Sequence, residues 1–354
     1  MRAAALALTL AALLTLAGAA PPAAVDAERL MDEAPAPTLT AYRLFIDAGA
    51  RTPNAGLTPY DVATPLFSDY ADKRRFIFLP PGLKARYAGA GLIDLPVGTV
   101  LVKTFAYPAD FRRPDEAVRF IETRLLIHRK AGWAALTYVW NDAQDQAVLK
   151  RAGMRLPIRF VDAAGRTRQV SYEVPNVNQC KQCHAQNGEI TPLGPKARNL
   201  NWTYPNAGGP ENQLAHWSRT GLLEGAPAPA TVPSTPLWSD AATPAEPRAR
   251  AYLDANCAHC HSRAGLASNS GLYLSWEETD PSVLGVGKRP VAAGRGAGGL
   301  EVSIDPGHPE RSILLYRMIS NEPGVMMPQI GRSVAHDEGV EAIRAYIAAM
   351  KPTP

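Results

Sequence analysis

Two short stretches, Cys180-Lys181-Gln182-Cys183-His184 and Cys257-Ala258-His259-Cys260-His261, use all four cysteines of the chain. Each has the pattern C-x-x-C-H, the attachment signature of c-type haem. Two thiols at this spacing form thioether bonds to the vinyl groups of one haem, and the histidine that follows binds the iron. The sequence therefore predicts two covalently held haem c groups. The predicted attachment residues are Cys180, Cys183, Cys257 and Cys260, and the predicted proximal iron ligands are His184 and His261.

Three other uses of paired cysteines fit the pattern less well. A zinc site built from two C-x-x-C pairs usually has roughly 15 to 20 residues between them, and here the pairs lie much farther apart, at 180–183 and 257–260. A thioredoxin-like pair lies beside a βαβ pattern, which neither stretch has. A disulfide across two residues closes too small a loop to stabilise the fold much. Haem attachment alone accounts for a histidine directly after both pairs.

The N-terminus has the features of an export signal. Arg2 supplies a positive charge, residues 3–16 form a short apolar run, and Ala17-Gly18-Ala19 gives the small-residue cleavage pattern. We therefore expect a cleaved signal peptide over residues 1–19, a flexible leader over 20–37 and a periplasmic location. A retained N-terminal anchor is the alternative, although the run is short for a membrane span. We expect no integral membrane segment after signal cleavage.

The amino-acid composition bears on the binding partners and on the kind of fold. The formal net charge is only +4, and no basic run is present, so the sequence gives no indication of nucleic-acid binding. The 32 prolines and 28 glycines favour a loop-rich exported protein over a helical bundle. With 354 residues the chain is long enough for two domains.

The first half of the chain has the pattern of strands. Short runs rich in β-branched and aromatic residues alternate with turn residues, which predicts an antiparallel sandwich or small barrel. The predicted strands lie at 75–79, 99–105, 120–127, 133–140, 155–161 and 166–174. Residues 211–223 follow with helical spacing. Residues 224–247 are rich in proline, alanine, serine and threonine, which indicates a linker.

The second half has the plan of a small helical domain. A short helix is expected over 248–256, leading directly into Cys257, and another over 338–350 with Asp337 as its cap. Tyr252 and Tyr346 suit the crossing of these two helices. We therefore expect an α+β protein. Its domains are an antiparallel β-rich domain over 38–223 with the first haem site, a linker over 224–247, and an α-helical cytochrome c-like domain over 248–354 with the second.

The sequence indicates a sixth iron ligand more clearly for the second haem than for the first. Met326-Met327-Pro328 lies between a Gly-rich segment and the last predicted helix. Proline stiffens a loop that presents a sulfur, and a thioether ligand raises the reduction potential, so Met327 is the predicted sixth ligand of the second haem, with Met326 as the alternative. For the first haem the candidates are His128, Met154 and His216. An iron left five-coordinate is the remaining alternative.

Eight further strings carry a resemblance. They are PLFSDYA at 65–71, ETRLL at 122–126, YVWN at 138–141, PN at 175–176, LGPKAR at 193–198, NQL at 212–214, DPGHP at 305–309 and MP at 327–328. With the two C-x-x-C-H stretches, they make the chain resemble a family of bacterial dihaem c-type cytochromes with an N-terminal β-rich domain and a C-terminal cytochrome c domain. The biochemical role of that family is largely unassigned. Its members are often associated with parallel β-helix repeat proteins.

Three functions follow from these expectations. The first is electron transfer between periplasmic donor and acceptor proteins through the two haems. The second is a dihaem reductase or peroxidase-like enzyme with an open iron position at the first haem, for which His128, His216 or Glu122 would be the first candidate acid/base groups. The third is a haem-bearing module that docks an exported β-helix repeat protein. Electron transfer leads, and the sequence leaves open whether any substrate is turned over.

Overall fold

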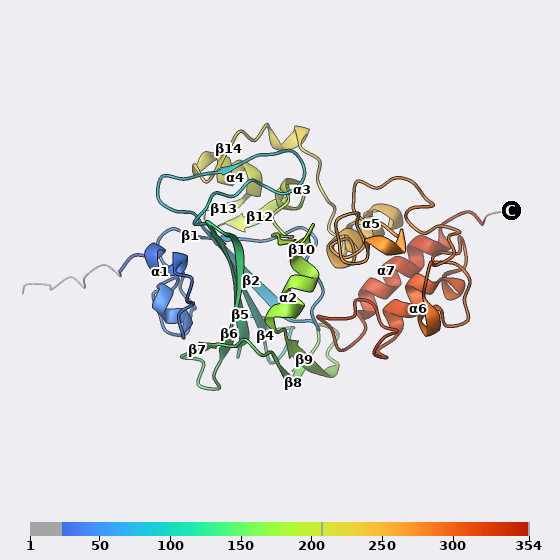
Figure 1. The fold of residues 1–354 in the computed structure, drawn as a ribbon, viewed down its shortest axis with the longest axis horizontal. Helices are drawn as coiled ribbons and strands as arrows, with labels where there is room; N and C mark the ends of the chain where they lie inside the picture. The colour runs from blue at the N-terminus through green and yellow to red at the C-terminus, as the bar shows by residue number, and fades with distance from the viewer. Residues whose placement is uncertain (1–22, 207, 353–354) are drawn as a thin grey trace, which may run out of the picture.

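The computed structural model describes residues 23–206 and 208–352, so the predicted signal peptide lies outside the described residues. The N-terminal part is built around a six-stranded antiparallel sheet with the strand order β1-β2-β4-β5-β6-β7 (Figure 1). Its strands are β1 (Leu57–Tyr60), β2 (Asp72–Phe78), β4 (Val100–Tyr107), β5 (Arg119–Arg129), β6 (Gly132–Trp140) and β7 (Ala147–Leu149). A separate antiparallel hairpin joins β8 (Met154–Val161) to β9 (Thr167–Val174).

The predicted strands are confirmed, and so is the α+β class. Each predicted run falls on β2, β4, β5, β6, β8 or β9. The large sheet is open, because its edge strands β1 and β7 do not pair with each other. A closed barrel is therefore not the architecture of this part of the chain. Two-stranded pieces complete the strand set: β3 (Ala85–Arg86) with β14 (Leu223–Glu224), β10 (Ala185–Gln186) with β11 (Glu189–Ile190), and β12 (Thr203–Asn206) with β13 (Gly209–Asn212).

The two faces of the sheet are covered by different segments. Alternate residues of β4 point to opposite faces, so that Val100 and Val102 pack in one core cluster while Leu101 and Phe105 pack in two others. In Figure 1, α1 (Ala27–Met31) lies on one side of the sheet, and α2 (Val177–His184) lies on the other, with the C-terminal helices beyond it. The second face is thus the one that meets the rest of the molecule. Helices α3 (Ala197–Leu200) and α4 (Gln213–Arg219) cover one end of it.

The expected flexible leader over 20–37 is wrong for its described C-terminal part. Leu30 and Ala36 are fully buried in the first core cluster. The Asp26 carboxylate caps α1 by accepting a hydrogen bond from the Arg29 backbone N–H at 2.9 Å, and the Tyr138 hydroxyl donates to the Ala36 carbonyl at 2.9 Å. The composition is typical of a linker, but two apolar side chains suffice to attach the segment to the sheet.

The expected linker over 224–247 also needs correction. Its first half is fixed to the N-terminal part, because Val232 is buried in the core cluster that contains Trp217, and the Thr235 hydroxyl donates to the Asn199 side chain at 2.7 Å. Proline here gives an extended path over the surface and removes donors, without releasing the segment from the fold.

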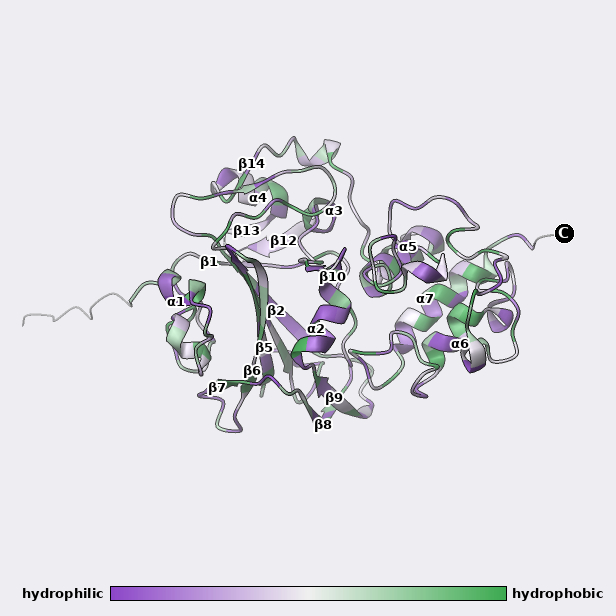
Figure 2. Cartoon of the chain, in the orientation of Figure 1, coloured by the Kyte–Doolittle hydropathy of each residue, from purple (hydrophilic) through white to green (hydrophobic). Residues whose placement is uncertain are grey.

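The C-terminal part is helical, with α5 (Ala245–Asn256), α6 (Ile313–Ile319) and α7 (Asp337–Ala348) around one core. Figure 2 shows hydrophobic residues concentrated on α6 and α7, whereas α2 is mostly hydrophilic. The predicted helix before Cys257 is confirmed, and Tyr252 and Tyr346 are both buried where α5 and α7 pack together. None of the helices in residues 23–206 and 208–352 has the length and apolar character needed to cross a membrane.

The predicted cap of the last helix is wrong. His336 occupies the N-cap position of α7 and its side chain makes no capping hydrogen bond. The Asp337 carboxylate instead pairs with the Arg168 guanidinium of β9 at 2.9 Å. An acidic residue in the first turn still interacts favourably with the helix dipole, and here it also joins the two parts of the molecule.

Gly339 sets the close crossing of α5 and α7. A Cβ at this position would overlap the phenol ring of Tyr252, which leaves no room for a side chain. Because the ring is itself packed in the core, it cannot easily move aside.

A buried ion cluster joins the two parts of the chain. Asp254, near the end of α5, accepts hydrogen bonds from Lys196 and Arg198 of the N-terminal part at 3.0 Å each. The Arg198 and Asp254 side chains are only 2 % and 1 % exposed. Asp254 also accepts from the Trp276 backbone N–H at 3.0 Å. Burial is the largest single effect and by itself raises the pKa of Asp254. The Lys196 and Arg198 charges and the Trp276 N–H together outweigh it, so the pKa lies below its usual range.

The helix crossing gives a first prediction. We expect Gly339→Val to lower the free energy of unfolding by about 1–3 kcal/mol or more, because overpacking at a closed contact strains the core. Ala348→Val, at an exposed position of the same helix, makes the matched change and should cost less than about 1 kcal/mol. Thermal unfolding of both variants measures the difference. Equal melting temperatures would show that the crossing does not depend on glycine.

The ion cluster gives a second prediction. We expect Asp254→Asn to destabilise the protein by up to about 3–5 kcal/mol, since it removes the buried partner of Arg198 and leaves that guanidinium only the exposed Glu277 carboxylate. The matched control is Asp94→Asn, which breaks the exposed Arg86–Asp94 pair and should cost no more than about 1 kcal/mol. Denaturant titration compares them.

The Asp254 ion cluster also predicts how the stability of the protein depends on pH. The pKa of Asp254 is lower in the folded protein, so its contribution is fully present above the unfolded value of about 4 and is lost as pH falls through the folded value. The stability difference between the wild type and Asp254→Asn should therefore shrink below about pH 4. A difference that grows on acidification would contradict this assignment.

Candidate functional site

The first C-x-x-C-H stretch lies on α2, directly after the last strand of the β8–β9 hairpin. Asn176 begins the helix with a capping box: its side chain accepts from the Gln179 N–H at 2.9 Å, and the Gln179 side chain accepts from the Asn176 N–H at 2.9 Å. This cap places Cys180, Cys183 and His184 on successive turns of one short helix. The sequence alone predicted the exit of a strand here and did not predict the helix.

His184 is held as a neutral imidazole with one nitrogen engaged. Its Nδ1 lies 2.9 Å from the Thr191 carbonyl oxygen, to which its N–H donates a hydrogen bond. Burial lowers the pKa of His184 to about 4. Metal-binding histidines characteristically donate one ring N–H to a carbonyl and bind through the other nitrogen. The arrangement therefore leaves Nε2 of His184 free to act as an iron ligand.

The second stretch follows the end of α5. Asn256 fixes this end in two directions, because its Nδ2 donates to the Tyr252 carbonyl at 2.9 Å and its Oδ1 accepts from the Phe67 backbone N–H at 2.8 Å. The His261 Nδ1 lies 3.3 Å from the Ser270 hydroxyl. Burial lowers the pKa of His261, so this imidazole too is neutral near pH 7.

The two stretches, far apart in the sequence, meet in space. The two thiols influence each other: interaction with Cys260 raises the pKa of Cys183, and interaction with Cys183 lowers the pKa of Cys260 to about 4. The Cys260 thiol lies 3.9 Å from the Gln182 carbonyl oxygen, and the Asn187 N–H donates to the Ala264 carbonyl at 3.2 Å. The contact between the N-terminal and C-terminal parts thus passes through the two stretches themselves.

The four cysteines do not form a zinc site. All four are free thiols, and among the described residues no group of three or more His, Cys, Asp or Glu side chains is arranged to hold a metal ion. This geometry counts against a tetrahedral Cys₄ centre. The same geometry does not count against haem attachment, because a haem iron takes only one or two ligands from the protein.

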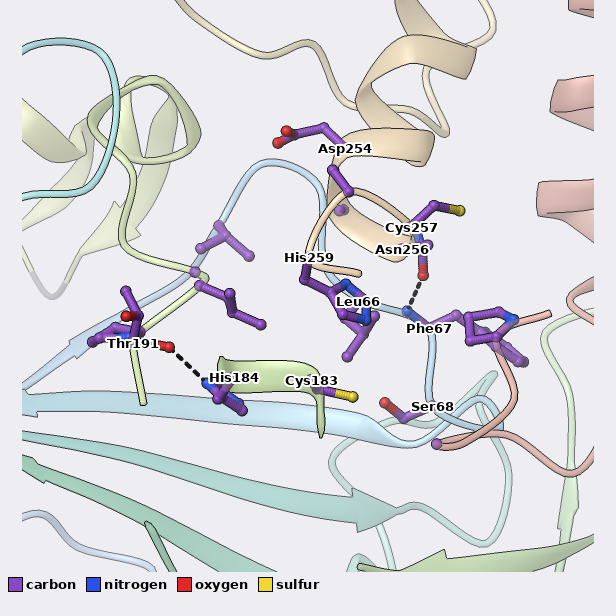
Figure 3. A pocket seen from close by; sticks show the side chains of 18 of the residues that line it. Leu66, Phe67, Ser68, Cys183, His184, Thr191, Asp254, Asn256, Cys257 and His259 are labelled. Atoms are coloured by element: carbon purple, nitrogen blue, oxygen red, sulfur yellow. Dashed lines mark hydrogen bonds between the residues drawn. The ribbon is translucent and has the colours of Figure 1, made fainter. Parts of the chain in front are cut away.

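A cavity of about 620 Å³ lies between the sheet and the C-terminal helices and reaches both stretches. Four of the six predicted attachment and ligand residues line it: Cys180, Cys183, His184 and Cys257. Figure 3 shows part of this wall, with Cys183 and His184 on one side and Cys257 and His259 on another. Cys260 and His261 lie beyond the lining residues. The volume is in the usual range for a ligand or cofactor site.

The predicted sixth ligand of the second haem also lines the cavity. Met327 belongs to the wall, whereas Met326 is 7 % exposed and packed away from it. The Arg332 guanidinium donates to the Met327 carbonyl at 3.0 Å and to the Ser320 carbonyl at 2.8 Å, which fixes the loop that carries the thioether. Of the two methionines, the structure favours Met327 as the residue able to reach a group in the cavity.

None of the sequence-derived candidates for the first haem lines the cavity. His128 stacks on Trp133 with ring centroids 4.5 Å apart, and its Nδ1 is bonded to the Leu95 carbonyl. Met154 packs against the aromatic core of the hairpin. His216 is paired with Glu211 at 2.8 Å on α4. The sequence could not separate these residues from cavity residues, because their distance from Cys180 is set by the tertiary fold.

The sheet presents positive charge to the cavity. Arg75, Lys103 and Arg124 are direct neighbours across β2, β4 and β5, and all three line the wall. Arg124 is paired with the fully buried Glu122, its Nε lying 3.0 Å from Oε2. Arg75 is likewise paired with Asp61. Among the described residues no carboxylate pairs with Lys103, and burial together with the neighbouring cations lowers its pKa well below the usual range. An anionic group beside Lys103 would favour its charged form, so the wall suits an anion.

Comparisons with protein-family models, with curated proteins and with solved structures found no match to this chain.

Substitution at the two methionines gives a third prediction. In the haem-loaded protein, Met327→Ala should remove a ligand from the second iron, lower its reduction potential and make that haem high-spin. Met326→Ala should leave both haem spectra unchanged, since its side chain lies in the core and its loss affects stability alone. A redox titration with optical detection decides between them. If the two variants behave the other way round, Met326 is the ligand.

Proposed function

We propose that this protein is an exported dihaem c-type cytochrome that transfers electrons between periplasmic donor and acceptor proteins. The observation that carries the proposal is the meeting of the two C-x-x-C-H stretches at one cavity, with the Cys260 thiol 3.9 Å from the Gln182 carbonyl oxygen. Thiols brought together only to stabilise the fold would need no histidine after each pair. Two haems held at these positions would be near neighbours, which favours electron exchange between them.

The chemistry of the cavity supports haem as the occupant. Four free thiols and the neutral His184 supply attachment and ligation. Ser262 Oγ, Arg198 Nε and Arg332 Nε are buried without a hydrogen-bond partner among the described residues, and these three residues line the cavity. Buried polar atoms are normally paired. Anionic carboxylates such as haem propionates would satisfy them and the positive wall of the sheet.

The chain's own residues would have distinct tasks. When bound, each haem supplies an iron that takes up and releases one electron. His184 and His261 would hold the irons from one side, and Met327 would raise the potential of the second. Lys103 and Arg124 would favour the added negative charge of a reduced group nearby, since a buried positive charge stabilises it. Export supplies the compartment in which such attachment takes place.

The enzyme alternative has less support from the geometry. A distal acid or base must reach the substrate, and His128 and His216 do not line the cavity. Glu122 accepts hydrogen bonds from the Tyr172 hydroxyl at 2.6 Å and from Arg124, so its carboxylate is held away from that task by two partners. Docking to an exported β-helix repeat protein rests on the family resemblance alone.

A fourth prediction tests the proposal directly. The protein is produced with a c-type haem maturation system, and covalent haem is counted by intact mass and by the pyridine haemochrome spectrum. We expect two haems per chain, both low-spin, with reversible reduction and no reaction with cyanide.

Paired variants assign the sites. Cys180→Ala with Cys183→Ala and Cys257→Ala with Cys260→Ala should each remove one haem. A chain that acquires no covalent haem would refute the proposal, and a high-spin haem that binds cyanide in the wild type would favour an enzyme.

A further inference from the structure

The cavity restricts which side chain can complete the coordination of the first iron. Besides the cysteines and His184, its described wall carries six imidazole, thioether or amine side chains that could offer a nitrogen or sulfur donor to an iron. They are Lys103, Lys196, His259, Met318, Met327 and His336.

Four of these six have other roles, and Lys103 carries an amine instead of the imidazole or thioether that usually ligates haem iron. Lys196 donates to the Asp254 carboxylate at 3.0 Å. Met318 lies in the core of the C-terminal helices, and Met327 belongs to the loop beside the second haem site. His336 is wedged between aromatic rings: it stacks on Phe67 with centroids 4.1 Å apart, and its Nδ1 lies 3.1 Å from the Tyr252 hydroxyl. Moving this imidazole to an iron would break both interactions.

His259 is different, because it is buried and has no fixed polar partner. The residue is only 8 % exposed. Among the described residues its ring interacts with the Cys260 sulfur and with no carboxylate or carbonyl oxygen within hydrogen-bonding distance. Once Cys260 carries a thioether, this contact is weak, since a thioether sulfur is a poor acceptor. A buried imidazole without a strong partner is costly unless a ligand satisfies it.

The position of His259 relative to the first haem site also supports a role as a ligand there. It belongs to the second C-x-x-C-H stretch, between Cys257 and Cys260, yet it lines the cavity that contains His184 of the first. Figure 3 places the His259 ring and the His184 ring on facing parts of the wall.

We propose that His259 is the sixth iron ligand of the first haem. The inference rests on the proposed function, namely that both stretches hold haem c. The second stretch would then serve two haems: Cys257, Cys260 and His261 hold one, and His259 completes the other. Two imidazoles give a lower potential than an imidazole with a thioether, so an electron entering at the first haem would move on to the second.

A fifth prediction tests the proposal by spin state. In the haem-loaded protein, His259→Gly should convert one of the two haems from low-spin to high-spin, seen as a charge-transfer band near the red end of the optical spectrum and in electron paramagnetic resonance. Added imidazole should restore the low-spin spectrum. His259→Met should stay low-spin and shift the potential of the first haem upwards. His216→Gly makes the same change at a histidine that does not line the cavity, and this matched control should leave both haems low-spin.

Each outcome separates this proposal from the proposed function. Fewer than two covalent haems in the wild type would refute the proposed function itself. With two haems present, a His259→Gly protein that stays fully low-spin, or a His216→Gly protein that becomes high-spin to the same extent as His259→Gly, would overturn His259 as the ligand. If His259→Gly does not fold, His259→Met decides: an unchanged potential of the first haem overturns the proposal, and a raised one supports it.

Discussion

The buried ion cluster of Asp254 with Lys196 and Arg198 is the constraint on which the rest of the structure depends. It joins the end of α5 to the N-terminal part at a point where the Arg198 and Asp254 side chains are almost completely buried and Lys196 is partly exposed. Asp254 lies one turn before Cys257, so the same contact fixes the position of the second C-x-x-C-H stretch against the first. Removal of either charge would leave the other in a low-dielectric environment, which makes the geometry difficult to change.

The cavity follows from this arrangement. The sheet supplies a flat wall with Lys103 and Arg124, α2 crosses it with Cys183 and His184, and the C-terminal helices close it with Met327. Each wall is rigid for its own reason: strand pairing in the sheet, a capping box at α2, and Arg332 contacts in the methionine loop. A redox cofactor needs a surrounding that reorganises little, and three fixed walls provide it.

The interface also connects the parts of the molecule through aromatic contacts. Phe67 and Tyr70 of the N-terminal part surround His336 of the C-terminal part, and the Tyr70 hydroxyl donates to Glu338 at 3.0 Å. Stacked and edge-to-face rings add to the stability gained by burying their area. Relative motion of the two parts is therefore opposed both by ion pairs and by packing. This would suit the proposed function, in which two haems must keep a constant separation.

The sequence by itself determined the strands, the α+β class and the helix before Cys257, and it predicted which residues would attach haem. The β-branched residues along Val100–Tyr107 and the fixed C-x-x-C-H spacing are local properties, and local patterns need no knowledge of the fold. Only the tertiary structure decided that Leu30 belongs to the core, that Arg198 is committed to Asp254, and that His128, Met154 and His216 lie away from the cavity while His259 lines it. Each of these depends on which segments meet in space, and long-range packing is not encoded in the spacing of any one segment.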